Sequence, residues 1–99
     1  MALMQFTVIP VGSGTPSVGE YVALIQKALE RERVAYTLND MGTVVEGKAD
    51  DLFALAAKMH NLCFQRGLQR VVTQVSVDDR RDKEVGLGDK IKSVRNRLE

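Results

Sequence analysis

Polar side chains that can bind a small molecule gather in one short stretch of this sequence, residues 39–47 (NDMGTVVEG). Asn39, Thr43 and Glu46 provide an amide, a hydroxyl and a carboxylate, which can donate to and accept from a nitrogen heterocycle. Glu46 follows two valines, and its carboxylate can accept from an amino group or balance a cation. The spacing alone favours a plain structural role, with a turn at Asn39 and Asp40 and a strand that ends at Glu46.

The sequence offers no recognisable catalytic constellation. His60 is the single histidine and Cys63 the single cysteine, so the sequence argues against a zinc site, and no Ser/His/Asp or Cys/His set is recognisable because one histidine would have to serve every role. Cys63 shares a predicted helical face with Met59 and Ala56, which indicates a small buried hydrophobe rather than a nucleophile. We therefore predict no catalytic residue, no metal and no cofactor.

Charge and composition narrow the class of partner. The 99 residues carry 14 Lys+Arg and 13 Asp+Glu, a net charge of +1, so no general attraction to nucleic acid or to a membrane surface is expected. No segment approaches the roughly 20 apolar residues that span a bilayer. A single cysteine suits a reducing compartment. The expectation is one cytoplasmic domain, residues 1–99, without nucleic-acid or membrane partners.

Hydrophobic periodicity predicts the elements that position these residues. Asp50 or Asp51 can cap the second helix, and Gly67 suits a left-handed end to it. The predicted order is β-α-β-β-α-β with an added C-terminal helix, a ferredoxin-like α+β sandwich in which both helices cover one face of an antiparallel sheet. The predicted strands are residues 3–9, 35–39, 43–46 and 70–77, and the predicted helices are residues 18–32, 51–66 and a terminal one from residue 87.

The loop at residues 12–15 (GSGT) joins the first strand to the first helix. Its backbone N–H groups at a helix start could cradle an anion. The loop lacks the lysine of a Walker motif, and its glycines do not match the dinucleotide-binding pattern. A flexible connection is therefore favoured over nucleotide binding, while a contact to a small ligand stays open.

The uncovered face of the predicted sheet is uncharged. Gln5, Thr7, Gln74 and Ser76 fall on it, whereas the covered face carries Met4, Phe6, Val8, Val71, Val75 and Val77. Exposed faces and edges are normally protected by charge, proline or bulges. We predict that this face and at least one edge are buried against a second copy of the chain, although strand propensity alone also favours Thr. A stripe on the terminal helix is likewise predicted to be buried, within the chain or against a neighbour; it comprises Leu87, Ile91, Val94 and Leu98.

Three stretches of the sequence together resemble the small thiamine-binding YkoF-like family, long catalogued as an uncharacterised protein family. They are residues 8–14 (VIPVGSG), residues 40–47 (DMGTVVEG), and Arg70 to Val72 leading to residues 78–83 (DDRRDK). The likeness spans nearly the whole chain, and the Met-Gly-Thr-x-x-Glu-Gly run is its most specific part. Asp40 departs from the proline expected before Met41, which affects the turn more than any binding group.

The resemblance implies a ferredoxin-like protomer that assembles into dimers and tetramers and binds thiamine or its hydroxymethylpyrimidine part without known catalysis. An aminopyrimidine needs acceptors for its amino group and donors for its ring nitrogens. The leading hypothesis is thus a homo-oligomeric binding protein. Its rivals are an enzyme acting on a small metabolite and a structural or regulatory oligomerisation module.

The ligand site is expected on the open sheet face and at the hairpin ends, with Gln5, Thr7, Asn39, Thr43 and Glu46 as its residues. Thr43 and Glu46 are three positions apart, so on a regular strand they point to opposite faces. A bulge, or a pocket reached from the strand end, is needed for both to touch one ligand. Of these residues, Glu46 is the one most strongly expected to bind the ligand. Its carboxylate can also pair with the positively charged thiazolium ring of thiamine, which would otherwise lose its water without a compensating charge.

Overall fold

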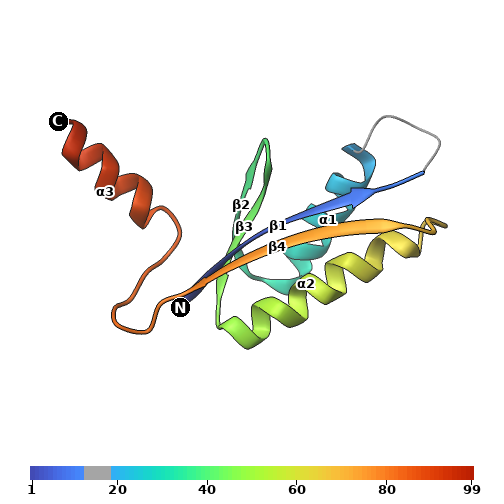
Figure 1. Ribbon diagram of the computed structural model, residues 1–99, viewed down its shortest axis with the longest axis horizontal. Coiled ribbons are helices and arrows are strands. Elements are labelled where there is room, and N and C mark those ends of the chain that lie inside the picture. The colour runs from blue at the N-terminus through green and yellow to red at the C-terminus, as the bar shows by residue number, and fades with distance from the viewer. Residues whose placement is uncertain (13–18) are drawn as a thin grey trace.

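A computed structural model of the protein describes residues 1–12 and 19–99. It confirms the predicted α+β architecture: a four-stranded antiparallel sheet in the order β2-β3-β1-β4, covered on one face by α1 and α2 (Figure 1). Most of the loop at residues 12–15 lies outside the described residues. The elements are β1 (Ala2–Pro10), α1 (Gly19–Glu32), β2 (Ala35–Asn39), β3 (Gly42–Gly47), α2 (Ala49–Phe64), β4 (Val71–Asp79) and α3 (Asp89–Leu98).

The central strand β1 alternates between buried and more exposed side chains along its length. Its even-numbered residues face the helices because side chains on a strand point alternately to the two faces of the sheet. Antiparallel pairing carries this alternation to the neighbours, with Met4 opposite Val45 of β3 and Val77 of β4. The predicted assignment of the two faces agrees with this register. The apolar core consists of Ala2, Met4, Phe6, Val8, Ile25, Ala28, Leu29, Val45, Leu52, Leu55, Ala56, Met59 and Cys63.

The start of α2 differs from the prediction. Lys48, rather than Asp50 or Asp51, precedes the first helical residue in extended conformation, and it makes no capping hydrogen bond through its side chain. The two aspartates instead lie in the first turn, where carboxylates interact favourably with the positive end of the helix dipole. Gly67 has a φ of 86°, the left-handed conformation predicted for it.

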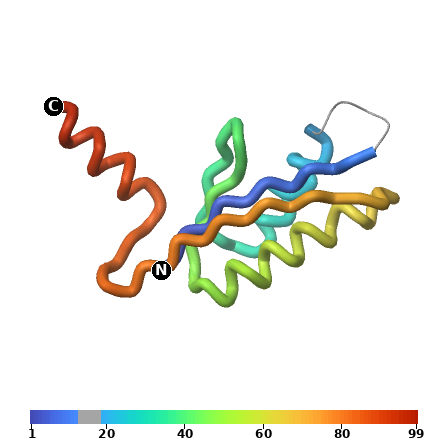
Figure 2. Tube along the Cα trace, viewed as in Figure 1, coloured from blue at the N-terminus to red at the C-terminus, as the bar shows by residue number. Residues whose placement is uncertain are grey.

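The terminal helix α3 begins at Asp89, two residues later than predicted, because Gly88 adopts a φ of 85° and breaks the helical run. The segment before α3 leaves the end of β4, and the helix stands away from the body of the molecule (Figure 2). Its apolar stripe is not covered by the chain itself: Ile91, Val94 and Leu98 are exposed. Burial of this stripe against a neighbouring molecule remains a prediction.

Methionines at two positions test where the core lies. Met59 is fully buried under the sheet and Met41 is 83% exposed at the hairpin tip. Met59→Ala should lower the free energy of unfolding by about 2–5 kcal/mol, because it removes buried methylene groups and leaves a cavity. Met41→Ala should change it by less than about 0.5 kcal/mol. Urea denaturation of the two variants measures the difference, and equal effects would contradict this placement of the core.

Candidate functional site

A pocket lies where the β2–β3 hairpin parts from β1. The pairing of β1 with β3 ends at Phe6 and Thr43, whereas its pairing with β4 continues to Pro10 and Val71. The second half of β1 therefore has a partner on one side only. The hairpin tip, this half of β1 and α1 enclose a cavity of about 270 Å³. It is lined by Phe6, Thr7, Val8, Ile9, Val22, Ile25, Gln26, Leu38, Asn39, Asp40, Met41, Gly42 and Thr43.

A close approach of backbones holds the hairpin tip against β1. The Thr7 hydroxyl donates to the Met41 carbonyl oxygen at 3.2 Å. A Cβ on Gly42 would lie 3.0 Å from the Thr7 hydroxyl oxygen and 3.2 Å from the Phe6 carbonyl oxygen, tighter than ordinary contact. A larger residue at this position would therefore push Thr7 or the β1 backbone away by a few tenths of an ångström, so space rather than backbone conformation favours glycine. Its presence places Thr7 and the hairpin turn on the rim of the same pocket.

The polar floor of the pocket comes from α1 and β3. The Gln26 amide nitrogen donates to the Thr43 hydroxyl oxygen at 3.1 Å, and Thr43 is only 5% exposed. The Gln26 Oε1 atom is buried and has no hydrogen-bond partner within the part of the chain that the structure describes. An unpaired buried acceptor costs about 1–3 kcal/mol, so this atom is a favourable place for a ligand to donate a hydrogen bond.

The pocket unites three of the five residues expected at the site. Thr7, Asn39 and Thr43 all line it, although Thr7 belongs to the open face of the sheet and Thr43 to the helix-covered face. The pocket lies at the strand end, where residues of both faces line it, but it does not contain Glu46, the residue that was expected to share a ligand with Thr43. Gln26 was missed by the sequence analysis. The available signal was that Gln26 is the one long uncharged polar side chain in a helix whose other long polar residues are charged.

Gln5 and Glu46 lie outside this pocket. Both belong to the open face, Gln5 beside Val44 and Glu46 beside Leu3. Leu3 is four residues from Thr7, about 13 Å along an extended strand. The segment before α3 also passes over Glu46, since a Cβ built on Gly86 would lie 2.5 Å from its Oε1 atom. One chain therefore does not bring Glu46 to a ligand in the hairpin pocket.

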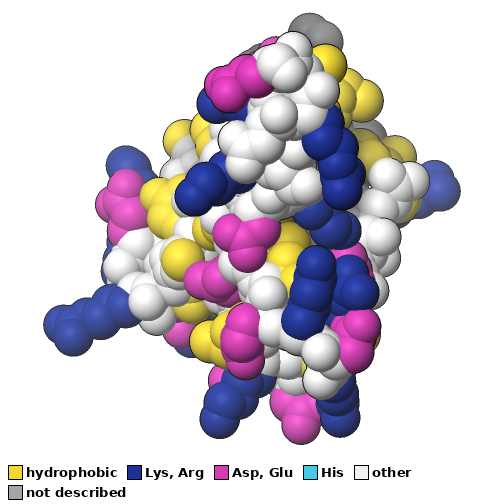
Figure 3. Space-filling model, turned by 90° about the vertical axis from the view of Figure 1, so that its left-hand side faces the viewer, with side chains coloured by type: hydrophobic (Ala, Val, Ile, Leu, Met, Phe, Trp, Pro, Cys, Tyr) yellow, Lys and Arg dark blue, Asp and Glu magenta, His cyan; other side chains and the backbone are white. Residues whose placement is uncertain are grey.

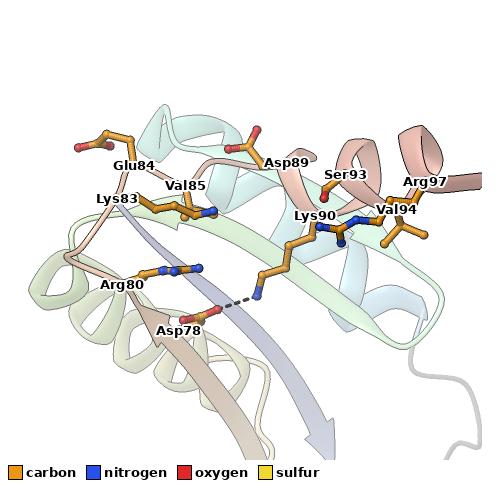
Figure 4. A pocket seen from close by; sticks show the side chains of 10 residues that line it. All are labelled: Asp78, Arg80, Lys83, Glu84, Val85, Asp89, Lys90, Ser93, Val94 and Arg97. Carbon is orange, nitrogen blue, oxygen red and sulfur yellow. Dashed lines mark hydrogen bonds and ion pairs between the residues drawn. The ribbon is translucent and has the colours of Figure 1, made fainter.

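A larger cleft, about 580 Å³, lies between α3 and the end of β4 (Figure 4). Its charged side chains are of both signs, and this whole end of the molecule carries a mixture of basic and acidic groups (Figure 3). The Lys90 ammonium donates to Asp78 at 2.6 Å, and this hydrogen bond and charge hold the pKa of the Asp78 carboxyl below its ordinary value. Because charged side chains of both signs dominate its lining, the cleft is a weaker candidate for an uncharged heterocycle than the hairpin pocket.

The predicted role of Cys63 as a buried hydrophobe agrees with its environment. Cys63 is fully buried, and burial raises the pKa of its thiol, which disfavours the nucleophilic thiolate. His60 extends from α2 to the sheet, where its Nδ1 atom lies 2.6 Å from the hydroxyl oxygen of Thr73 on β4. Among the described residues, no group of three or more His, Cys, Asp or Glu side chains could hold a metal ion.

Comparison with known proteins identifies the family. A family model described as "Thiamine-binding protein" matches residues 4–95. The chain belongs to this family. The UPF0045 protein YqgV of Bacillus subtilis is 46% identical over 103 residues, which cover 100% of this chain and 99% of that protein. A UPF0045 protein of Methanothermobacter thermautotrophicus is 37% identical over 99% of this chain and 100% of its own length.

Solved structures agree on the fold of this thiamine-binding family member. A hypothetical protein from Methanocaldococcus jannaschii matches with a TM-score of 0.83 and 29% identity, covering 95% of each chain. A putative thiamine biosynthesis/salvage protein from Thermotoga maritima matches with a TM-score of 0.77 at 15% identity, covering 95% of this chain and 98% of that one. At this identity the second likeness shows the fold alone. No helix in the described ranges has the length and apolar character needed to cross a bilayer.

Replacement of one hydroxyl tests the polar floor of the pocket. Thr43→Val keeps the shape of the side chain but removes the acceptor of the part-buried Gln26 amide nitrogen, next to an amide oxygen that already has no partner among the described residues. The free energy of unfolding should fall by about 1–3 kcal/mol. Thr37→Val, at an exposed position on β2, is the matched control and should leave stability within about 0.5 kcal/mol. Equal urea midpoints for the two variants would show that the hydrogen bond contributes nothing.

Proposed function

We propose that the protein is a non-catalytic binding protein for thiamine or its hydroxymethylpyrimidine part, and that the hairpin pocket receives the pyrimidine ring. Membership of the thiamine-binding family supports the ligand class. The observation that carries the choice of site is Gln26, which lines this pocket and whose buried Oε1 atom has no hydrogen-bond partner among the described residues. An exocyclic amino group is a donor of the kind that this acceptor lacks.

The remaining groups of the pocket suit the same ring. Asn39 offers an amide that can donate to a ring nitrogen, and Thr7 adds a hydroxyl at the rim. Phe6, Val8 and Ile25 supply apolar walls for the faces of a flat heterocycle. Met41, highly exposed at the hairpin tip, is long and polarizable enough to close over a bound ring.

We propose further that the protein works as a homo-oligomer, a dimer or tetramer, in the cytoplasm. The middle of the open face supports the first statement, because Gln5, Thr7, Gln74 and Ser76 carry none of the charges that protect an exposed sheet, and the charged Glu46 and Asp78 lie only at one end of it. The single cysteine, free and buried, supports the second. In such an assembly, Gln5 and Glu46 complete a ligand site if the open face of one copy meets the hairpin pocket of another.

A thermal-shift series with hydroxymethylpyrimidine, thiamine and thiamine phosphates tests the ligand. A compound present at 100 times its dissociation constant should stabilise the protein by about 2.7 kcal/mol. Gln26→Met, which retains size but removes the acceptor, should weaken hydroxymethylpyrimidine by about 0.5–1.5 kcal/mol, the usual contribution of one hydrogen bond. Gln69→Met makes the same change at an exposed position outside the pocket and should not. Absence of any shift for the wild type would refute the proposed function, and turnover of a compound would favour an enzyme.

Glu46→Gln tests whether the protein binds the thiazolium ring of thiamine separately from its pyrimidine ring. If Glu46 is the ionic partner of the thiazolium, this change should weaken thiamine by about 1.5–3 kcal/mol, the contribution of a hydrogen bond to a charged group. Binding of hydroxymethylpyrimidine, which lacks the cation, should be unchanged, and the fold should survive because Glu46 lies on the open face. Calorimetry of both ligands measures the contrast. Unchanged thiamine affinity would remove Glu46 from the site and leave the hairpin pocket as the whole of it.

A further inference from the structure

Asp40 brings one negative charge to the rim of the hairpin pocket. Asn39 pairs with Gly42, so Asp40 and Met41 form the two-residue turn between β2 and β3. Both turn residues line the pocket, and both are exposed. Of the described residues that line the pocket, Asp40 alone carries a charge, and Glu46 lies outside it. The contacts proposed for the pyrimidine ring use only uncharged groups, so they leave this carboxylate without a role.

The turn that carries Asp40 is held in place against the sheet. The Thr7 hydroxyl donates to the carbonyl oxygen of Met41, the next residue after Asp40, and thereby ties the turn to β1. None of the ion pairs within the described part of the chain includes Asp40. The carboxylate is therefore fixed near the pocket without a cation of these residues to neutralise it, and a charged group of a ligand can interact with it.

Exposure along the pocket runs from a closed inner end to an open rim. Thr43 is 5% exposed and the Gln26 Oε1 atom is buried at the inner end, whereas Met41 is 83% exposed at the rim. A ring that donates to Gln26 must therefore direct its larger substituents toward the rim, because buried side chains close the inner end. In thiamine this substituent is the methylene-linked thiazolium ring. In the thiamine phosphates, the phosphoryl groups are attached to that ring through its hydroxyethyl arm.

We infer that Asp40 makes the hairpin pocket select the unphosphorylated, cationic form of thiamine over its phosphate esters. The inference rests on the proposed function, because it takes thiamine as the ligand and the hairpin pocket as its site. It adds the charge state of the ligand, which the contacts to the pyrimidine ring leave open.

The sign of the charge at the rim separates the two kinds of ligand. The thiazolium ring carries one positive charge, which a carboxylate attracts. A phosphate monoester carries about −1.5 to −2 at pH 7, so in thiamine monophosphate it outweighs the thiazolium charge and Asp40 faces a net negative group. In water, one pair of unit charges about 4 Å apart changes an equilibrium about 5-fold, which is about 1 kcal/mol. The value for water applies because Asp40 is exposed.

Calorimetry with thiamine, thiamine monophosphate and hydroxymethylpyrimidine tests the role of Asp40. Asp40→Asn keeps the shape of the side chain and suits a turn, but it removes the charge. This change should weaken thiamine about 5-fold without weakening the monophosphate, so the preference for thiamine should fall about 5-fold or more. Hydroxymethylpyrimidine, which lacks the cation, should bind equally to the variant and the wild type.

A matched variant and a salt series provide the controls. Asp51→Asn removes the same charge at an exposed position in the first turn of α2, beyond the far end of β3 from the turn, and should leave the preference unchanged. The Debye length falls from about 30 Å at 0.01 M salt to about 3 Å at 1 M. The wild-type preference should therefore shrink with added salt more than that of Asp40→Asn, a difference that a purely structural role of Asp40 would not produce.

The outcomes separate failure of this inference from failure of the proposed function. A wild type that binds thiamine no more tightly than its monophosphate would overturn the inference alone. So would an Asp40→Asn variant that keeps the wild-type preference, or an Asp51→Asn variant that loses as much of it. A wild type that binds none of the three compounds would overturn the proposed function and the inference with it.

Discussion

Pairing of the central strand β1 with both neighbours is the constraint on which the other features depend. With β3 on one side and β4 on the other, the alternation of β1 side chains decides the facing of residues on both partners. Met4, Phe6 and Val8 have to face the helices because they are the apolar set that the core requires. In the same register, Thr43 faces the helices and Glu46 faces the open side of the sheet. A shift of β3 by one residue along β1 would reverse the two.

The hairpin pocket follows from the unequal lengths of the two pairings. Once β3 has parted from β1 after the Phe6–Thr43 pair, the hairpin tip and the second half of β1 enclose space that α1 closes from the helix side. Gly42 and the Thr7 hydrogen bond keep the tip close enough for the space to stay a pocket rather than an open groove. The Gln26 amide oxygen has no partner among the described residues, which leaves hydrogen-bonding capacity for a ligand.

In a two-layer sandwich, the sheet face and the strand edges that the helices do not cover are open to contact with other molecules. Both helices lie on one face, so the opposite face and the two edge strands meet solvent in a single chain (Figure 1). On an edge strand, half of the backbone groups lack partners in the sheet, and a run of uncharged residues offers no barrier to a further strand.

The sequence by itself determined the order of the elements, the fold class and the residues of each sheet face, because these follow from periodicity within single segments. It also indicated that Cys63 is buried and that Thr43 and Glu46 point apart. Boundaries that depend on partners were less predictable: β4 extends to Asp79 because Ala2 pairs with it, and α3 starts late because Gly88 turns the chain. The meeting of Gln26 with Thr43, and the separation of the hairpin pocket from Glu46, were decided only by the tertiary structure. They depend on where α1 crosses the sheet and where β3 leaves β1, and no local pattern in the sequence encodes either position.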